Sequence, residues 1–315
     1  MKSGYFLKKY EKTRCSIFII WGLISFFFFL TQHEAWGRRV KELGNSISNL
    51  KYIYGPVSSW RLGISLGIDP ISQAEKICSF ECFYCQVGPT DILTTERQIF
   101  VKTDDILEEL KYVLANLSEE VNYITLAGRG EPTLAGNLGE IVRGVKKITN
   151  IPIAILTNAT LLGRKDVQED LKEIDFVIAK IDAYDEDSFR LMNNPHEDLS
   201  FTSVIEGIRE FRKTYAGRMG IQIMFTQENK QGAEKIARIV KELGLKPGDQ
   251  IQLNTPLRPR VDSYLEEPDM RDIKRIFEEF LAGMGLEIVM VYEAEHKEVS
   301  PLGERETLQR RGAVK

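Results

Sequence analysis

The chain has 315 residues, of which 43% are hydrophobic and 28% are charged, as is ordinary for a soluble globular protein. This length fits two average domains or one α/β barrel with additions, and it argues against a small secreted scaffold held by disulfides. The first 50 residues hold eight basic and three acidic residues, so 34 of the 42 basic and 43 of the 46 acidic residues remain for an acidic body, which disfavours non-specific binding to nucleic acid.

Residues 1–50 differ from the rest of the chain. Residues 16–30 form an uncharged, Phe-rich run behind a basic flank, and these fifteen residues fall short of the number required to cross a bilayer, which is roughly 20. Three interpretations are open: a weak membrane anchor, a signal sequence, or a stretch translated upstream of the true start. We therefore treat residues 1–50 as an N-terminal hydrophobic extension.

From residue 51 onward, apolar runs that predict buried strands alternate with amphipathic runs that predict helices. Strands are predicted over residues 60–68, 121–127, 153–156, 176–179, 221–225 and 251–253. Helices are predicted over residues 103–117, 138–148, 166–174, 201–215 and 232–243. A further helix over 270–282 and a strand over 286–291 follow, and the polar tail after Glu293 shows no pattern.

This alternation predicts an α/β fold in which helices cover a parallel sheet. Each of the six strands ends in a polar or glycine-rich cluster. In a barrel such ends converge on one mouth, whereas an open sheet uses only its switch point. The decorated ends therefore favour a barrel or partial barrel over residues 51–260. Residues 261–315 would form a short C-terminal extension of a helix, a strand and the polar tail.

Three of the four cysteines lie within eight residues, at Cys78, Cys82 and Cys85. Three thiolates on one loop can hold three corners of an iron–sulfur cluster and leave the fourth iron open to another ligand. The alternatives are buried thiols, a disulfide with a spare thiol, or a zinc site completed by His196 or His296. Clustered cysteines also indicate a reducing compartment.

Polar groups at the other strand ends are candidate ligand contacts. Gly128-Arg-Gly-Glu131 combines glycines that allow close backbone approach with a carboxylate that attracts ammonium groups. Later strand ends carry Thr157, Asn158, Lys180, Asp182 and Asn254, and Asp182 is preferred over Lys180 because a carboxylate accepts from hydroxyls. Turn formation and capping are the simpler explanation for each of them. Tyr84 would pack on a flat ring or fill the core.

The cysteine loop resembles the cluster loop of the radical S-adenosylmethionine (SAM) superfamily, in which SAM chelates the open iron. Residues 51–259 are similar to a set of Fe–S oxidoreductases of unassigned substrate, loosely grouped with wyosine-type tRNA-modifying enzymes. The shared blocks are Gly55-Pro-Val, Arg61-Leu-Gly-Ile-Ser-Leu-Gly, Cys85-Gln-Val-Gly, Gly130-Glu-Pro-Thr-Leu, Leu156-Thr-Asn, Asp182-Ala, Asn194-Pro-His and Leu253-Asn-Thr-Pro. Arg129 departs from the Gly-Gly-Glu motif of the family.

The resemblance implies a partial (β/α)6 TIM-like barrel with a [4Fe–4S] cluster on Cys78, Cys82 and Cys85. It implies SAM contacts at Tyr84, Gly128, Gly130, Glu131, Thr157, Asn158, Asp182 and Asn254. An enzyme of this kind uses an electron from a flavodoxin or ferredoxin type donor to cleave SAM reductively, and the 5′-deoxyadenosyl radical removes hydrogen from a substrate. The competing class is an electron-transfer or zinc protein that does not consume SAM, and a third class activates a partner protein.

The substrate is not identified by the sequence, although a nucleotide or a tRNA base is one candidate. Two interpretations are open for the basic residues: a rim that binds phosphate, or scattered solvated charges, which we prefer. These residues are Arg61, Arg97, Arg129, Lys180, Arg258 and Arg260. The resemblance begins abruptly at Lys51, and a reduced cluster belongs in the cytosol. We therefore expect a cytoplasmic protein and favour the upstream-translation interpretation of residues 1–50 over membrane association through residues 16–30.

Overall fold

The computed structural model describes residues 50–257, 262–293, 298–302 and 304–311. Residues from Ser48 onward form one compact unit. The expectations for residues 1–49, Arg258, Arg260 and His296 lie outside the described residues.

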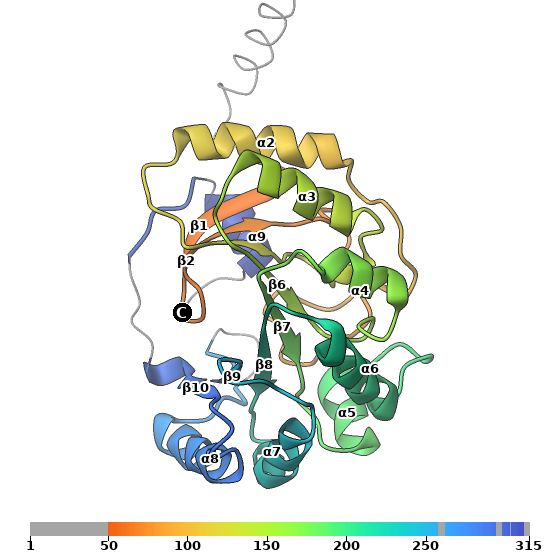
Figure 1. The fold of residues 1–315 in the computed structure, drawn as a ribbon, viewed down its shortest axis with the longest axis vertical. Helices are drawn as coiled ribbons and strands as arrows, with labels where there is room; N and C mark the ends of the chain where they lie inside the picture. The colour runs from red at the N-terminus through yellow and green to blue at the C-terminus, as the bar shows by residue number, and fades with distance from the viewer. Residues whose placement is uncertain (1–49, 258–261, 294–297, 303, 312–315) are drawn as a thin grey trace, which may run out of the picture. The chain divides into compact units, whose positions relative to one another are not determined.

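An eight-stranded curled sheet forms the centre of this unit, in the order β1-β2-β5-β6-β7-β8-β9-β10 (Figure 1). Its strands are β1 (Ile53–Ser59), β2 (Gly63–Ile68), β5 (Tyr123–Leu126), β6 (Ile153–Thr157), β7 (Phe176–Lys180), β8 (Arg218–Met224), β9 (Gln250–Asn254) and β10 (Glu287–Met290). All neighbours from β2 to β10 pair in parallel, and β1 pairs with β2 antiparallel. A separate two-stranded sheet joins β3 (Ile77–Cys78) to β4 (Ile92–Leu93).

The helices α2 to α8 lie in an arc around the outer face of the sheet (Figure 1). They are α2 (Thr103–Asn116), α3 (Leu138–Ile148), α4 (Lys165–Leu171), α5 (Glu186–Asn193), α6 (Phe201–Thr214), α7 (Ala233–Lys241) and α8 (Glu267–Phe280), and α9 (Glu304–Arg311) follows β10. The partial TIM-like barrel expected from the sequence is confirmed, with six parallel strand–helix units from β2 to α8. Within the described residues, no helix is long and apolar enough to cross a membrane.

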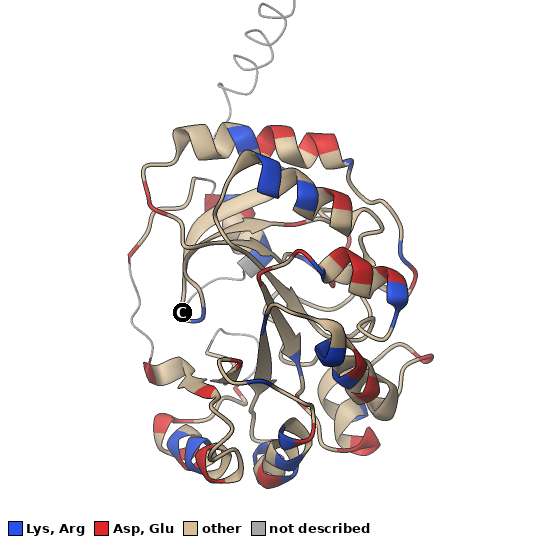
Figure 2. Ribbon diagram, in the orientation of Figure 1, with Lys and Arg blue, Asp and Glu red and all other residues tan. Residues whose placement is uncertain are grey.

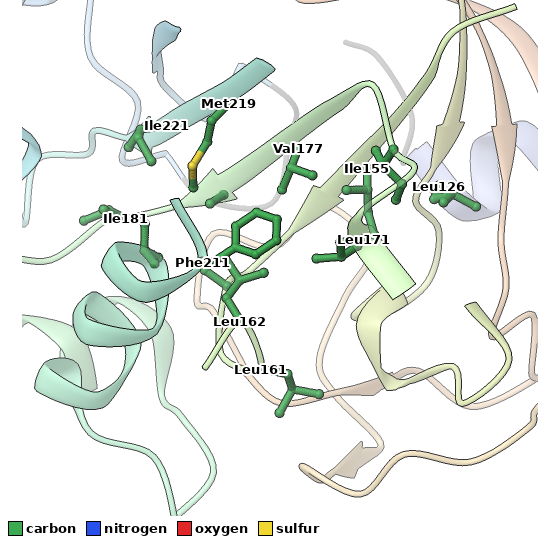
Figure 3. Close-up of a cluster of buried hydrophobic side chains, with 14 of the residues drawn as sticks. Leu126, Ile155, Leu161, Leu162, Leu171, Val177, Ile181, Phe211, Met219 and Ile221 are labelled. Carbon is green, nitrogen blue, oxygen red and sulfur yellow. The ribbon is translucent and has the colours of Figure 1, made fainter. Parts of the chain in front are cut away.

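The main core lies between the outer face of the sheet and these helices. Alternate residues of the strands, such as Ile155, Val177 and Ile221, point toward Phe211 of α6 and Leu171 of α4 (Figure 3). All five side chains are buried, as the two-residue period of a strand requires. The residues between them on each strand therefore point to the inner, concave side. Figure 2 shows that acidic and basic side chains are interspersed over the helices of the outer layer.

Strand β1 is absent from the sequence prediction, which also placed the start of β2 at Trp60 rather than Gly63. Residues 60–62 form a turn instead. Strand β1 contains Pro56, and proline argues against a strand because it has no N–H to donate to a neighbouring strand. The structure accommodates it at the sheet edge, where the β1–β2 register shifts between Tyr54 and Val57.

Two helices were also missed. Helix α5 has only eight residues, and its start is a capping box between Asp185 and Ser188. Helix α9 lies in the polar tail, where no helix was predicted because the tail shows no apolar pattern. Its buried surface is polar: Thr307 accepts a hydrogen bond from Gly55 N, and Arg310 reaches Asp69.

Candidate cofactor site

The three cysteines lie on β3 and the loop that follows it. Their thiols are free and half-buried. The loop is held against the end of α5, because Glu81 N donates to the Asn193 carbonyl at 3.0 Å. The Phe80 ring also packs edge-on against Phe189 of α5, with centroids 5.3 Å apart. The missed helix α5 is therefore what positions the cysteine loop.

Each thiol has a nearby nitrogen donor. The Lys76 ammonium lies 3.2 Å from Cys85 Sγ. The Asn193 amide lies 3.4 Å from Cys82 Sγ, and the Asn158 amide lies 3.7 Å from Cys78 Sγ. Two of these donors, Lys76 and Asn193, were missed by sequence reasoning, because a lone Lys and a lone Asn carry no motif.

The surroundings of the three thiols differ in charge. Burial, with the nearby Glu131 carboxylate, raises the pKa of Cys78 to about 12. Burial also raises the pKa of Cys82. Burial is also the largest single influence on Cys85, but Lys76, the backbone N–H of Val87 and Lys180 together outweigh it and lower the pKa of that thiol. Within the loop, Cys85 is therefore the thiol whose anion is favoured most.

In the part of the chain that the structure describes, no three His, Cys, Asp or Glu side chains converge as ligands of one metal ion. His196 does not complete a zinc site with the cysteines: its Nδ1 accepts from Asp198 N at 3.3 Å, and its backbone N–H donates to the Ser79 carbonyl. A cluster makes a different demand, since each thiolate binds its own iron atom and the sulfurs need not meet at one point.

Glu131 joins the end of β5 to the end of β6. Its Oε1 accepts from Thr133 N at 3.1 Å and from the hydroxyls of Thr133 and Thr157, both at 2.6 Å. Its Oε2 accepts from Asn158 N at 2.7 Å. The side chain is buried, and burial raises its pKa although these donors oppose the shift. A carboxylate has about four acceptor positions, and protein donors use most of them: Oε1 accepts three hydrogen bonds and Oε2 accepts one.

The two glycines before Glu131 are tightly packed, Gly130 against Ile77 at the start of the cysteine loop and Gly128 against Asp69 at the end of β2. A Cβ on Gly130 would lie 1.8 Å from the Ile77 carbonyl oxygen, and one on Gly128 would lie 2.1 Å from the Asp69 carboxyl carbon. Gly130 also forms an isolated bridge with Ile77. Gly130 has no room for a side chain because its backbone touches that of Ile77, and Gly128 has none because the Asp69 carboxyl group fills the space. The strand end and the cysteine loop are thus one rigid unit.

Asp182 forms a second buried network at the end of β7. Its Oδ1 accepts from Met224 N at 2.7 Å, and its Oδ2 accepts from Tyr84 OH and from Asn193 Nδ2. The Lys180 ammonium lies 3.7 Å from Oδ2 and 4.5 Å from the centroid of the Tyr84 ring. Tyr84 is buried and belongs to the cysteine loop, so its hydroxyl links the loop to this network.

Arg97 is one of the basic residues for which scattered charges were preferred over a phosphate-binding rim. Arg97 is buried, pairs with Asp166 at 2.8 Å and with Asp170, and donates to the carbonyls of Thr133 and Ala135. These contacts make Arg97 a structural residue that ties the chain before α2 to α4.

Comparison with known proteins decides the family. The radical SAM superfamily model matches residues 76–240, a range that includes all three cysteines, Glu131 and Asp182. The chain belongs to the radical SAM superfamily. A radical SAM domain of this kind makes the protein an enzyme.

Several relatives share this radical SAM domain. A UPF0026 protein of Synechocystis is 43% identical over 208 residues, covering 66% of this chain and 76% of that protein. A UPF0026 protein of Methanocaldococcus jannaschii is 38% identical over 224 residues, covering 71% and 69%. A probable GTP 3′,8-cyclase of Saccharolobus islandicus is 29% identical over 202 residues, covering 64% and 62%.

Solved radical SAM structures have the same fold. A radical SAM methyltransferase from Sphaerobacter thermophilus aligns with a TM-score of 0.52 at 12% identity, over 72% of this chain and 66% of that chain. The structure of anSMEcpe with bound AdoMet aligns with a TM-score of 0.51 at 23% identity, over 71% and 64%. At such identities the likeness shows the fold alone.

Proposed function

We propose that Cys78, Cys82 and Cys85 hold a [4Fe–4S] cluster with which this radical SAM enzyme cleaves SAM reductively. The observation that carries the proposal is the rigid contact between the cysteine loop and the strand end 128–131 through the Ile77–Gly130 bridge. Soft thiolates are the ligands that iron–sulfur clusters take. When bound, the cluster supplies an electron to SAM, and SAM supplies the 5′-deoxyadenosyl radical that removes hydrogen from the substrate.

The buried ammonium of Lys76 fits this assignment. It is hydrogen-bonded to Cys85 Sγ and, at 2.5 Å, to the Gly88 carbonyl, and no carboxylate of the described residues pairs with it. A buried charge is costly unless it is paired. Negatively charged sulfur ligands would provide the missing counter-charge.

The eight predicted SAM contacts divide into two groups by their surroundings. Glu131 and Asp182 have their carboxylates occupied by protein donors, so we assign them to positioning the strand ends rather than to direct contact. Tyr84 and Thr157 donate to these two carboxylates and belong with them. The Asn158 amide is also engaged, by Ser79 and Thr160, and joins this first group. The backbone at Gly128 and Gly130 and the amide of Asn254 remain as the candidates for direct contact with SAM.

The inner face of the sheet supports a polar substrate. Lys180 lies beside Gln222, which lies beside Gln252, so all three point to the concave side. Gln252 is buried and its Oε1 has no hydrogen-bond partner, which leaves an acceptor for an N–H or O–H group. One relative is named as a probable GTP 3′,8-cyclase. We therefore propose a nucleotide or nucleobase as substrate.

A direct test of the cofactor proposal is anaerobic reconstitution of the full chain with iron and sulfide. We expect about four iron and four sulfide ions per chain, with the broad visible absorption of a cluster. The Cys82→Ala variant should lose this cluster, because each thiolate holds one iron. Zinc in place of iron in the parent, or equal cluster content in Cys82→Ala, would overturn the assignment.

The substrate proposal is tested separately by equilibrium binding of GTP, ATP and nucleosides to the reconstituted protein with SAM present. Binding of at least one nucleotide that Gln252→Leu weakens about tenfold would support it, since a buried unpaired donor costs 1–3 kcal/mol. No binding across the panel would contradict it.

We propose that a low-potential protein of the flavodoxin or ferredoxin type supplies the electron.

A further inference from the structure

Lys76, Asn193 and Asn158 place one nitrogen donor beside each sulfur of the cysteine loop. The three donors come from separate elements: the residue before β3, the end of α5 and the turn after β6. We propose that these residues set the reduction potential of the cluster and raise it, with Lys76 contributing most. The inference rests on the proposed function, because it concerns the cluster that the cysteines would hold.

Lys76 is fixed in place by its backbone. Its N–H donates to Asp91 Oδ2 at 2.7 Å, and its carbonyl accepts from Asp91 N and Ile92 N at 3.0 and 3.1 Å. The residue is 4% exposed. Its ammonium is therefore held at Cys85 by a pinned backbone and a second acceptor at Gly88. Lys76 is therefore a buried lysine with fixed partners rather than a solvated surface lysine.

Asn193 is also fixed by its hydrogen-bond partners. It is 2% exposed, and its amide nitrogen also contacts Tyr84 OH and Asp182 Oδ2, both at 3.0 Å. Asp182 is anchored in turn by Met224 N. The amide nitrogen has two hydrogens for three acceptors, of which Cys82 Sγ at 3.4 Å is the farthest, and a network that reaches across β7 and β8 holds it beside that sulfur. Asn158 is the weakest of the three, because its amide nitrogen is nearer to Ser79 Oγ, at 2.8 Å, than to Cys78 Sγ.

The direction of the effect follows from charge. Reduction adds an electron to the cluster and its sulfur ligands, so positive charge and N–H donors stabilise the reduced form more than the oxidised form. A full charge at 3.2 Å in a water-poor site acts more strongly than a neutral amide dipole. The expected order of contributions to the potential is therefore Lys76, then Asn193, then Asn158.

The test is an anaerobic redox titration of the reconstituted full chain, followed by electron paramagnetic resonance. Lys76→Met and Asn193→Leu should both shift the midpoint to more negative values, and Lys76→Met should shift it further. Lys76→Arg keeps the charge and should stay near the parent. The exposed Lys172→Met is the matched control and should leave the midpoint unchanged.

Iron content and visible absorption are measured first for every variant. A parent without a cluster would refute the proposed function. Full clusters with midpoints that match the parent in both Lys76→Met and Asn193→Leu would overturn the present inference and leave the proposed function standing. If Lys76→Met holds no cluster, the comparison of parent, Lys76→Arg and Asn193→Leu decides, and an unshifted Asn193→Leu counts against the inference.

Discussion

Glu131 links three parts of the candidate site through one buried carboxylate. It receives hydrogen bonds from Thr133, Thr157 and the backbone of Asn158, so it fixes the ends of β5 and β6 relative to each other. The cysteine loop rests on the adjacent Gly130. A single residue therefore sets the relation between the loop and two strand ends without itself needing to touch a ligand.

Replacement of Glu131 by Ala should leave the iron content unchanged and weaken SAM binding. It leaves several buried donors unpaired, and each costs 1–3 kcal/mol, so we also expect a lower unfolding midpoint. Iron content, equilibrium SAM binding and thermal unfolding measure the three effects. The isosteric Glu131→Gln variant, which keeps part of the acceptor set, should lie between Ala and the parent. SAM binding equal to that of the parent in Glu131→Ala would reduce the motif to a plain turn.

At the residue scale, the sequence indicated candidate motif residues but not the side chains that contact them. Spacing alone indicates that Cys78, Cys82 and Cys85 are candidate metal ligands. Asn193 carries no such signal, because it lies 111 residues from Cys82 along the chain and the two meet only in the folded structure. A direct SAM role for Glu131 and Asp182 stays a prediction from residue type, and residue type does not say how many acceptor positions the fold already uses.

At the scale of elements, strands and long helices followed from periodicity. Helix α3 was predicted with both of its ends, since its apolar positions form a clear face. The failures have local causes: β1 carries a proline at a bulged sheet edge, α5 is short, and α9 buries polar rather than apolar side chains. A helix that packs through Thr307 and Arg310 has no hydrophobic pattern to detect.

Helix α9 should stabilise the strand end that carries Gly128. Arg310 pairs at 3.1 Å with Asp69, both are buried, and Asp69 also accepts from Arg129 N. Removing one partner of a buried ion pair costs about 3–5 kcal/mol. We therefore expect Arg310→Met to lower the unfolding midpoint strongly and to weaken SAM binding.

Arg305→Met is the control for this change, because Arg305 lies on the same helix with its side chain 78% exposed. It should unfold like the parent. Equal unfolding midpoints for Arg310→Met and Arg305→Met would show that α9 does not support the site.

The tie between Arg97 and α4 predicts a pH dependence. Hydrogen bonds from Arg164, and with them Arg97, hold the pKa of Asp166 well below its usual value against the opposing effect of burial. A lowered pKa in the folded state gives stability that is present above the unfolded pKa, near 3.9, and is lost as the pH falls below it. Asp166 is 49% exposed, so we expect about 1 kcal/mol or less.

Urea unfolding at several pH values measures this contribution. The parent should exceed Asp166→Asn in stability at pH 6, and the difference should shrink as the pH falls from 5 toward 3. A difference that stays constant over this range would rule out the charge of Asp166 as its source.

At the scale of the whole molecule, the sheet separates two environments. Its outer face is apolar and packs on the helices, whereas its inner face carries Lys180, Gln222 and Gln252 near the carboxyl ends of adjacent strands. The strand count and the polar strand ends were enough to predict this architecture. Which polar groups remain unpaired, such as Gln252 Oε1, depends on neighbouring strands and was not predictable.

The measurement that tests the central claim most directly is the anaerobic formation of 5′-deoxyadenosine. The full chain is reconstituted with iron and sulfide, and SAM and dithionite are added beside a Cys82→Ala control. The account predicts that the parent releases 5′-deoxyadenosine and methionine and that Cys82→Ala releases neither above background. Intact SAM in the presence of a complete, reduced cluster, or equal product from Cys82→Ala, would contradict it.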